Sequence, residues 1–354
     1  MVLAWQARLR QHPSFLTKNN RMIQEHDYCM GNSSFPLETA HRLLLKSKAK
    51  GTLRNYGRMI AKLEKFAEDK KFNLDPVSVE CAGAFVCHLA DIKTSYAEVC
   101  KVSPALTVLH SCQGHKTMPS VKQAYIKLLI EGAKREAAAR RRKTLKADSI
   151  SKTQMCMIVE NILFAEKPNP IEVRTAMRWY VMYRTWCRWD GYAELKSENV
   201  TIDNEAVTMY FVRAKNDQYY SGTTCTLQIM GEENILCPRR VLLRYYSVLG
   251  YSGKGDEYLN CRIAWRKGKL IPKFKEKLGY TTSLENTKTL MNKFHITGRF
   301  SEKSLKVSGV SEAFNQGITV EDAMFHGRWR NPKTPGIYCN SSKKKRMKMS
   351  LFTM

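Results

Sequence analysis

Apolar residues recur at helical spacing near the start of the chain. Thr52 can cap a helix, and behind it apolar side chains return every three or four positions: Leu53, Tyr56, Ile60, Leu63 and Phe66. Cations occupy much of the remaining surface of this segment, namely Arg54, Arg58, Lys62 and Lys65. The pattern predicts a helix with one buried face and one basic face.

Two further segments show a similar periodicity. Residues 76–89 predict a second helix, and residues 119–132 predict a third, in which we expect Val121, Tyr125 and Leu128 to face inward. The residues before about 40 look irregular. The N-terminal part of the chain is therefore expected to form a helical bundle.

The pattern changes from about residue 148 onward. Residues 171–181 have helical spacing, whereas Ala206–Arg213 and Gly222–Ile229 alternate apolar and polar residues, as half-buried strands do. A polar turn joins these two predicted strands. The sequence therefore predicts a mainly α-helical protein with a small antiparallel β-sheet.

The charge of the chain indicates a polyanionic partner. Lys and Arg number 59 against 32 Asp and Glu, which gives a formal net charge of +27 over 354 residues. Binding to a nucleic acid through counterion release is the most direct interpretation. A generally basic soluble protein and a protein that binds acidic lipid are the alternatives. The length suggests two domains, and a hydrophobic content of 43% supports a globular chain.

Other classes of protein find little support in the sequence. No run approaches the ~18 apolar residues that span a bilayer, so we expect no membrane partner and an intracellular protein. The eleven cysteines are irregularly spaced, which favours reduced thiols over a disulfide framework. Cys112 and His115 have a metal-like spacing but lack a second pair of ligands, so we expect no metal.

Two short runs consist entirely of cations. The first contains Arg140, Arg141, Arg142 and Lys143, and the second runs from Lys343 to Arg346. Four consecutive cations repel one another unless an anion lies near. The first run falls between the helical region and the next patterned segment, where a linker between two domains would pass along DNA. A nuclear localisation signal is a second interpretation, and it is compatible with the first.

The last fifth of the chain carries an ordered set of chemically distinctive residues. Lys303-Ser304-Leu305-Lys306 comes first, followed by Gly317-Ile318, His326-Gly327-Arg328-Trp329 and Tyr338. This string resembles the second conserved box of the tyrosine recombinases, the family of phage integrases and Cre-type enzymes. Lys306 precedes Trp329 by 23 residues and Trp329 precedes Tyr338 by nine, which suits that family. The family usually has His and Arg where this chain has Lys303 and Lys306.

An upstream segment resembles the family's first box. Arg188, Leu195 and Asn199 match its arginine, the leucine seven residues on and the Asp or Asn eleven residues on. Gly191 stands where the family usually has an acidic residue. Lys215 follows the first predicted strand, in a segment that resembles the one carrying the family's catalytic lysine.

The resemblance implies DNA strand transfer through a 3′-phosphotyrosyl link, without metal, nucleotide or other cofactor. Attack on a phosphodiester builds negative charge on its non-bridging oxygens, and fixed cations must meet that charge. The implied roles are Arg188 as the first clamp arginine, Lys215 as the general acid, Lys303 at the His/Lys position, Lys306 at the second arginine position, Trp329 as the phosphate donor and Tyr338 as the nucleophile.

Two departures from the family bear on activity. Lys306 keeps the charge of an arginine but loses its two-pronged geometry, which costs about 2–4 kcal/mol of transition-state stabilisation if it resembles the loss of one oriented donor. Pro332, Pro335 and Gly336 are poor helix-interior residues, so we expect Tyr338 at a helix start or on a mobile loop.

The resemblance also implies a two-domain DNA clamp. Its parts would be an irregular segment 1–39, a helical core-binding domain 40–138, a basic linker 139–147, a catalytic domain 148–340 and a basic tail 341–354. The side chains expected on DNA are Arg54, Arg58, Lys62, Arg140, Arg141, Arg142 and Lys143.

Three functions remain open at this point. The first is a site-specific recombinase or integrase that acts in the nucleus on double-stranded DNA, as a homo-oligomer that is tetrameric in synapsis. The second is a domesticated or structural relative that binds DNA with weak or no cleavage, and the third is a type IB topoisomerase-like enzyme. The Lys-Ser-Leu-Lys string and the Gly-x-Trp variant look closest to recombinases of eukaryotic mobile elements and large DNA viruses.

Overall fold

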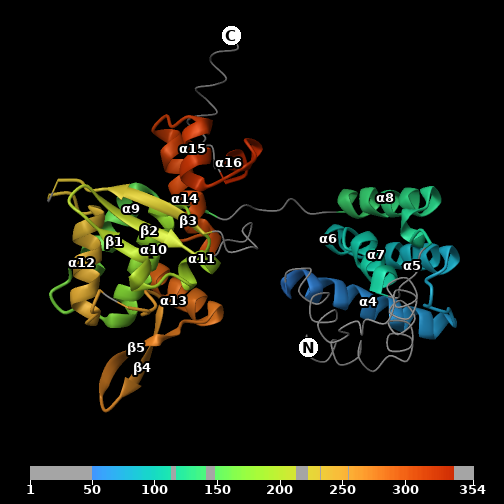
Figure 1. The fold of residues 1–354 in the computed structure, drawn as a ribbon, viewed down its shortest axis with the longest axis horizontal. Helices are drawn as coiled ribbons and strands as arrows, with labels where there is room; N and C mark the ends of the chain where they lie inside the picture. The colour runs from blue at the N-terminus through green and yellow to red at the C-terminus, as the bar shows by residue number, and fades with distance from the viewer. Residues whose placement is uncertain are drawn as a thin grey trace, which may run out of the picture. The chain divides into compact units, whose positions relative to one another are not determined.

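Two compact units divide the chain, one within residues 1–144 and the other within residues 145–354 (Figure 1). The computed structural model describes residues 50–112, 117–140, 148–212, 222–231, 233–253 and 255–338. In these ranges no helix is both long enough and apolar enough to cross a membrane. Each unit is described by itself below.

The N-terminal unit is a helical bundle, as its apolar periodicity predicts. Its elements are α4 (Lys50–Lys70), α5 (Val79–Asp91), α6 (Tyr96–Val99), α7 (Val102–Cys112), the 3-10 turn η1 (Ser120–Lys122) and α8 (Ala124–Ala139). Helix α4 buries Leu53, Ile60 and Leu63 and leaves Arg54 and Arg58 exposed. Helix α4 packs against α7, and α5 packs against α8. The predicted division of α4 into a buried and a basic face is therefore confirmed.

The expected orientation of the third predicted helix is wrong. Val121 is buried, but Tyr125 and Leu128 are 64% and 72% exposed. The buried stripe of α8 consists instead of Ile126, Ile130, Ala133 and Ala137. Leu128 lies two residues from both Ile126 and Ile130, which places it about 200° around the helix axis from each. Because η1 precedes α8 as a separate turn, Val121 does not share the phase of the helix that follows it.

The C-terminal unit surrounds one long buried helix. Its elements in chain order are α9 (Lys152–Ile158), the π-helical turn η2 (Val159–Leu163), α10 (Pro170–Thr185), α11 (Trp189–Ala193), η3 (Ser197–Asn199), β1 (Val200–Ile202), β2 (Ala206–Phe211), β3 (Thr223–Gln228), α12 (Pro238–Leu249), β4 (Cys261–Arg266), β5 (Lys269–Lys277), α13 (Tyr280–Lys293), α14 (Glu302–Asn315), α15 (Val320–Gly327) and α16 (Lys333–Tyr338). Helix α10 packs against α12, α13 and α14.

The expected antiparallel sheet is confirmed. Strands β1, β2 and β3 follow one another in the sheet, and Met209 of β2 pairs with Val200 on one side and Cys225 on the other. The inward positions of β2 are Val207, Met209 and Phe211, at the two-residue period of a half-buried strand. The polar turn expected between β2 and β3 lies outside the described residues.

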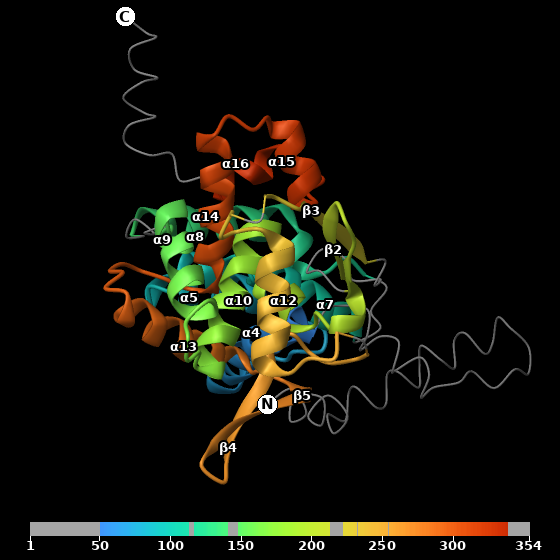
Figure 2. The ribbon, with the colours of Figure 1, turned by 90° about the vertical axis from the view of Figure 1, so that its left-hand side faces the viewer.

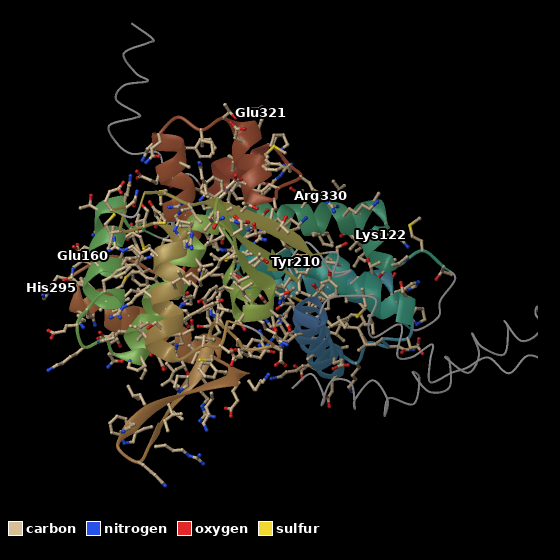
Figure 3. All side chains as sticks on the ribbon, turned by 60° about the vertical axis from the view of Figure 1, so that its left-hand side comes forward. Lys122, Glu160, Tyr210, His295, Glu321 and Arg330 are labelled. Atoms are coloured by element: carbon tan, nitrogen blue, oxygen red, sulfur yellow. The ribbon has the colours of Figure 1, made fainter. Side chains whose placement is uncertain are left out.

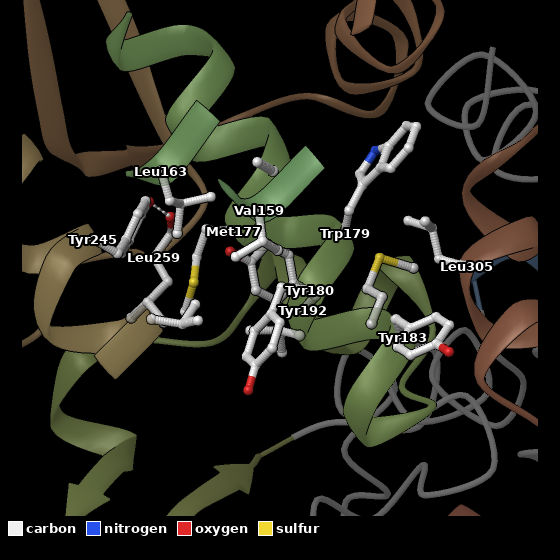
Figure 4. Packing of buried hydrophobic residues seen from close by; sticks show 14 of the residues in the cluster. Val159, Leu163, Met177, Trp179, Tyr180, Tyr183, Tyr192, Tyr245, Leu259 and Leu305 are labelled. Carbon is white, nitrogen blue, oxygen red and sulfur yellow. Dashed lines mark hydrogen bonds between the residues drawn. The ribbon is translucent and has the colours of Figure 1, made fainter. Parts of the chain in front are cut away.

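Helix α10 is buried on nearly every side. Trp179 and Tyr180 are fully buried, and Figure 4 shows Tyr180 packed among Val159, Met177 and Tyr192. Apolar burial of this extent is the main stabilising term of such a unit. It fixes the end of α10, from which the chain turns into the candidate site.

A buried ion pair joins α10 to α14. The Arg178 guanidinium is fully buried, its Nε lies 3.3 Å from Glu302 Oε2, and its Nη2 donates to Thr287 Oγ1 at 2.6 Å. Gly309 on α14 meets the same helix, since a Cβ built there would lie 2.0 Å from the backbone oxygen of Tyr183. Close helix contact and a desolvated pair therefore set the position of α14.

Candidate active site

Arg188 reaches the site because helix α10 ends at Thr185, three residues before it. Trp186 closes α10 in the left-handed conformation, with φ 51°, and Arg188 then takes the N-cap position of α11. Its Nη2 atom donates a hydrogen bond to the Tyr338 hydroxyl at 3.2 Å, although 150 residues separate the two in sequence. Packing of the whole unit is needed to make this contact.

Two stacked aromatic rings form the wall of the site. Trp329 and Tyr338 lie with ring centroids 5.5 Å apart and an interplanar angle of 10°. Both are buried, in a cluster with Trp186, Val307 and Val310. This cluster joins the end of α10 to α14 and α16, so the rings are held by packing rather than by surface loops.

Two lysines of α14 face these rings. The Lys306 Nζ atom lies 4.6 Å from the Trp329 ring centroid and 5.0 Å from that of Tyr338. Lys303, one helical turn earlier, places its Nζ 5.3 Å from the Tyr338 ring centroid. Lys303 is exposed, whereas Lys306 is 3% exposed. A cation held over aromatic faces in this way gains stabilisation from the ring quadrupoles.

The surroundings of Lys306 disfavour its charged form. Burial, together with the nearby guanidinium groups of Arg188 and Arg328, lowers the pKa of Lys306 to about 7. No carboxylate pairs with this ammonium anywhere in the described ranges. A buried cation surrounded by other cations indicates a site that an anion would complete.

The Trp329 ring nitrogen points to the same conclusion. Trp329 is 6% exposed, and its Nε1 is buried without a hydrogen-bond partner in the part of the chain that the structure describes. A buried donor without an acceptor is uncommon in folded proteins. An acceptor oxygen from a ligand would satisfy it.

The sequence motifs assign no role to Arg328. It holds a left-handed conformation, with φ 55°, and its Nη2 donates to the backbone oxygen of Thr185 at 2.8 Å. Its Cζ lies 5.0 Å from the Phe211 ring centroid at the end of β2. Arg328 is therefore the second guanidinium near Lys306, after that of Arg188. The only sequence signal for it is its place beside Trp329.

His326 has a packing role in the same motif. Its Nε2 lies 2.8 Å from the Arg184 backbone oxygen, and its ring meets the Trp186 ring edge-on at 4.4 Å. Burial lowers the pKa of His326. This histidine joins α15 to the end of α10, and through it positions Trp329 three residues later.

The expected surroundings of Tyr338 need correction. Tyr338 is the last residue of the short helix α16 and is buried, whereas a helix start or a mobile loop was expected. Pro335 is tolerated because it lies in the first turn of α16, where a backbone N–H has no intrahelical acceptor. Burial of Pro335 and Tyr338 against the rest of the cluster offsets the low helix propensity of this segment.

The structure therefore brings together five of the six candidate residues: Arg188, Lys303, Lys306, Trp329 and Tyr338. Lys215 lies outside the described residues.

Among the proposed DNA contacts, Arg54, Arg58 and Lys62 are exposed on α4, and Lys62 forms an ion pair with Glu98 at 2.9 Å. Arg140 is the C-cap of α8 and pairs with Glu136, while Arg141, Arg142 and Lys143 lie outside the described residues. In the described ranges, no group of three or more His, Cys, Asp or Glu side chains could hold a metal ion.

Comparison with known proteins identifies the fold. No protein-family model matches the chain, and a search of curated proteins finds no match. The solved structure of the XerH site-specific recombinase bound to palindromic difH substrate, a post-cleavage complex, matches with a TM-score of 0.57 at 13% identity, over 84% of this chain and 78% of that one. The XerH pre-cleavage complex with difH matches with a TM-score of 0.53 at 15% identity, over the same shares. The chain has the mostly helical fold of the tyrosine recombinases, as its motifs predicted.

Proposed function

We propose that this protein cleaves and rejoins double-stranded DNA, with Tyr338 as the nucleophile that forms a 3′-phosphotyrosyl link. The observation that carries the proposal is the hydrogen bond from Arg188 to the Tyr338 hydroxyl, beside the buried ammonium of Lys306. These three groups come from distant parts of the chain and surround one point. A phosphate at that point would meet a nucleophile and two cations.

Each residue has a task in this reaction. Arg188 and Lys306 would hold the non-bridging oxygens, and the free Trp329 Nε1 would donate a further hydrogen bond to one of them. Tyr338 Oη attacks phosphorus, the bond from phosphorus to the 5′ oxygen breaks, and a phosphotyrosyl ester replaces the phosphodiester. The phenol loses one proton and the leaving 5′ oxygen gains one, for which Lys215 is the candidate donor.

A second function is supported by a specific observation. Lys306 replaces the second clamp arginine, and its pKa near 7 leaves the group only partly charged at neutral pH. Gly191, where the family usually has an acidic residue, is buried and has no side chain to contribute. Both features favour a relative that binds DNA and cleaves it weakly or not at all.

A suicide substrate tests the proposal. The full-length protein is incubated with nicked duplexes that trap a covalent intermediate, and the products are resolved by denaturing gel and peptide mapping. We expect an adduct on Tyr338 and none with the Tyr338→Phe variant. Tight duplex binding without an adduct would support the second function, and an adduct on another residue would refute the assignment of Tyr338.

Further parts of the proposal concern assembly and place of action. We propose that the protein acts as a homo-oligomer on DNA, tetrameric in synapsis, and that it works in the nucleus as the recombinase of a mobile element. Synapsis of two sites that depends on protein concentration would separate a recombinase from a type IB topoisomerase-like enzyme, which needs no partner protomer.

A further inference from the structure

The hairpin formed by β4 and β5 stands apart from the body of its unit. Figures 1 and 2 show it projecting at the end of the unit opposite α15 and α16. Figure 3 shows its side chains extending clear of the rest of the unit. Its strands pair from Arg262 with Lys273 up to Arg266 with Lys269, and a two-residue turn of Lys267 and Gly268 closes it. Both turn residues have positive φ, 47° and 73°, as such tight hairpins require.

The two faces of this hairpin differ in chemistry. Side chains alternate along each strand, so directly paired residues share a face. The pairs Ile263 with Pro272 and Trp265 with Leu270 make one face apolar. The other face carries four cations in its outer pairs, Arg262, Arg266, Lys269 and Lys273, with Ala264 and Ile271 between them. A one-sided basic face on an exposed ribbon indicates an anionic partner of extended shape.

The cations of the hairpin differ in whether they form ion pairs. At the base, Arg262 pairs with Glu276 at 3.1 Å, Lys275 pairs with Asp256 and Lys277 pairs with Glu194. Arg266, Lys267 and Lys269 near the turn, and Lys273 opposite Arg262, form no ion pair with any described residue. Carboxylates thus neutralise three cations at the base and leave these four cations without a counter-charge among the described residues.

The base of the hairpin is fixed to the helix that begins at the candidate site. Glu194, the partner of Lys277, directly follows α11, whose N-cap is Arg188. Tyr280, three residues after β5, meets the Trp189 ring edge-on at 5.1 Å. The hairpin is therefore connected rigidly to the element that would hold the scissile phosphate.

We propose that the β4–β5 hairpin is a second DNA-binding element, which holds duplex phosphates away from the scissile one with Arg266, Lys267, Lys269 and Lys273. This inference rests on the proposed function. A two-stranded ribbon fits the groove of a duplex, and its cations then face the phosphates. The four steps from Arg262 to Arg266 span about 14 Å, which corresponds to about four base pairs. The hairpin would thus lengthen the bound DNA beyond the base pairs at the active site.

The test neutralises these four cations in the full chain. The variant with R266Q, K267Q, K269Q and K273Q is compared with the parent in a Tyr338→Phe background, so that cleavage does not disturb binding. We expect the slope of log K against log salt to fall by up to about 3.6 units, at about 0.9 per lost phosphate contact. Hydroxyl-radical footprinting should lose a block of about four protected base pairs that is separate from the protection at the cleavage site.

Two controls use exposed positions that leave the basic face intact. Lys152, Lys167, Arg239 and Lys288 are exposed cations on other elements of the same unit, and their replacement by Gln removes the same charge. Trp265→Ala changes the apolar face of the same hairpin, where the ring is 69% exposed. Both controls should keep the parent's salt slope and footprint. Thermal melting would verify that all variants are folded.

The outcomes separate the two proposals. Failure of the parent protein to bind any duplex would refute the DNA function itself. Duplex binding with an unchanged slope and footprint in the hairpin variant would refute only the hairpin's role. An equal loss in the four-residue control would mean that total charge, rather than this face, governs binding. A greater loss with Trp265→Ala would place the apolar face against the DNA and refute the role of the basic face.

Discussion

At the scale of single residues, the charge of Lys306 governs the candidate site. Its pKa is lowered from 10.5 to about 7 because burial and neighbouring cations disfavour the ammonium form. At a pH between these two pKa values, Lys306 binds a proton in the unfolded chain but not in the folded protein, so the free energy of unfolding rises with pH across this range. Below about pH 7 Lys306 is charged in the folded protein as well, so burial of its ammonium group destabilises the fold to the full extent. A bound phosphate would favour the charged form and would draw a proton into the site.

The variant Lys306→Arg tests this interpretation. Arginine stays charged and binds two phosphate oxygens, so single-turnover cleavage should accelerate by about tenfold or more. The parent's cleavage rate should fall as pH rises from 7 to 9, because Lys306 loses its proton in that range, and the variant should lose this part of the pH dependence. Rates on a suicide substrate at three pH values would measure both effects.

A matched control for this prediction is Lys333→Arg. Lys333 is exposed at the start of α16, five residues before Tyr338, and the change should leave both rate and pH profile as in the parent. A slower Lys306→Arg variant, or one that no longer binds DNA, would mean that the pocket fits only lysine.

At the scale of elements, the contact between α10 and α14 determines the geometry of the site. Helix α14 carries Lys303 and Lys306, and α10 leads to Arg188. Gly309 allows the two helices to approach closely, and the buried pair of Arg178 and Glu302 fixes their relative orientation. The site residues themselves contribute little to this arrangement, which is made by the helices that bear them.

The variant Gly309→Ala should therefore destabilise the second unit by about 1–3 kcal/mol, the usual cost of overpacking. Its new Cβ would lie 2.0 Å from the Tyr183 backbone oxygen and 2.8 Å from the Trp186 ring, so α14 must shift. Urea unfolding followed by tryptophan fluorescence measures the effect, because the tryptophans of the described residues all belong to this unit.

Gly132→Ala serves as the comparison for this helix substitution. A Cβ at Gly132 in α8 meets nothing within 4 Å, so alanine should raise the stability of the first unit by about 0.5–1 kcal/mol. Circular dichroism would follow that unit. Unfolding of Gly309→Ala at the parent's urea concentration would contradict the close contact of α10 and α14.

At the scale of the whole molecule, the excess of cations governs how the protein meets DNA. The net charge of +27 is distributed over both units and is the excess that remains after every carboxylate is counted, so ion pairs such as that of Lys62 with Glu98 do not reduce it. Exposed pairs of this kind add little stability. They leave a large cationic surface whose contribution to binding depends on salt.

The basic run Arg140 to Lys143 gives a prediction at this scale. Replacement of all four residues by Gln should weaken binding to specific and random duplexes alike and lower the salt slope by about two to four units. Binding titrations at several salt concentrations would measure the change. A variant with an unchanged slope but impaired nuclear import would instead identify the run as a localisation signal.

Local sequence patterns determined several helices and strands of this protein and its overall charge. Helix α4, the alternation in β2 and β3 and the charge excess depend on neighbours along the chain, so they could be predicted without a structure. The expected cap of α4 was wrong, because the helix begins at Lys50 and Thr52 lies inside it. The ordered string from Arg188 to Tyr338 likewise predicted the fold, and the structure brings five of its six candidate residues close together.

Only the tertiary structure decided which side chains meet, because such contacts depend on the packing of distant segments. It turned Tyr125 and Leu128 outward, placed Arg328 beside Lys306, and buried Tyr338 at the end of a helix. It also paired the cations at the base of the β4–β5 hairpin and left those near its turn free of described partners. The identity of each residue is written in the sequence, but its burial and its electrostatic surroundings arise only when segments up to 150 residues apart come together.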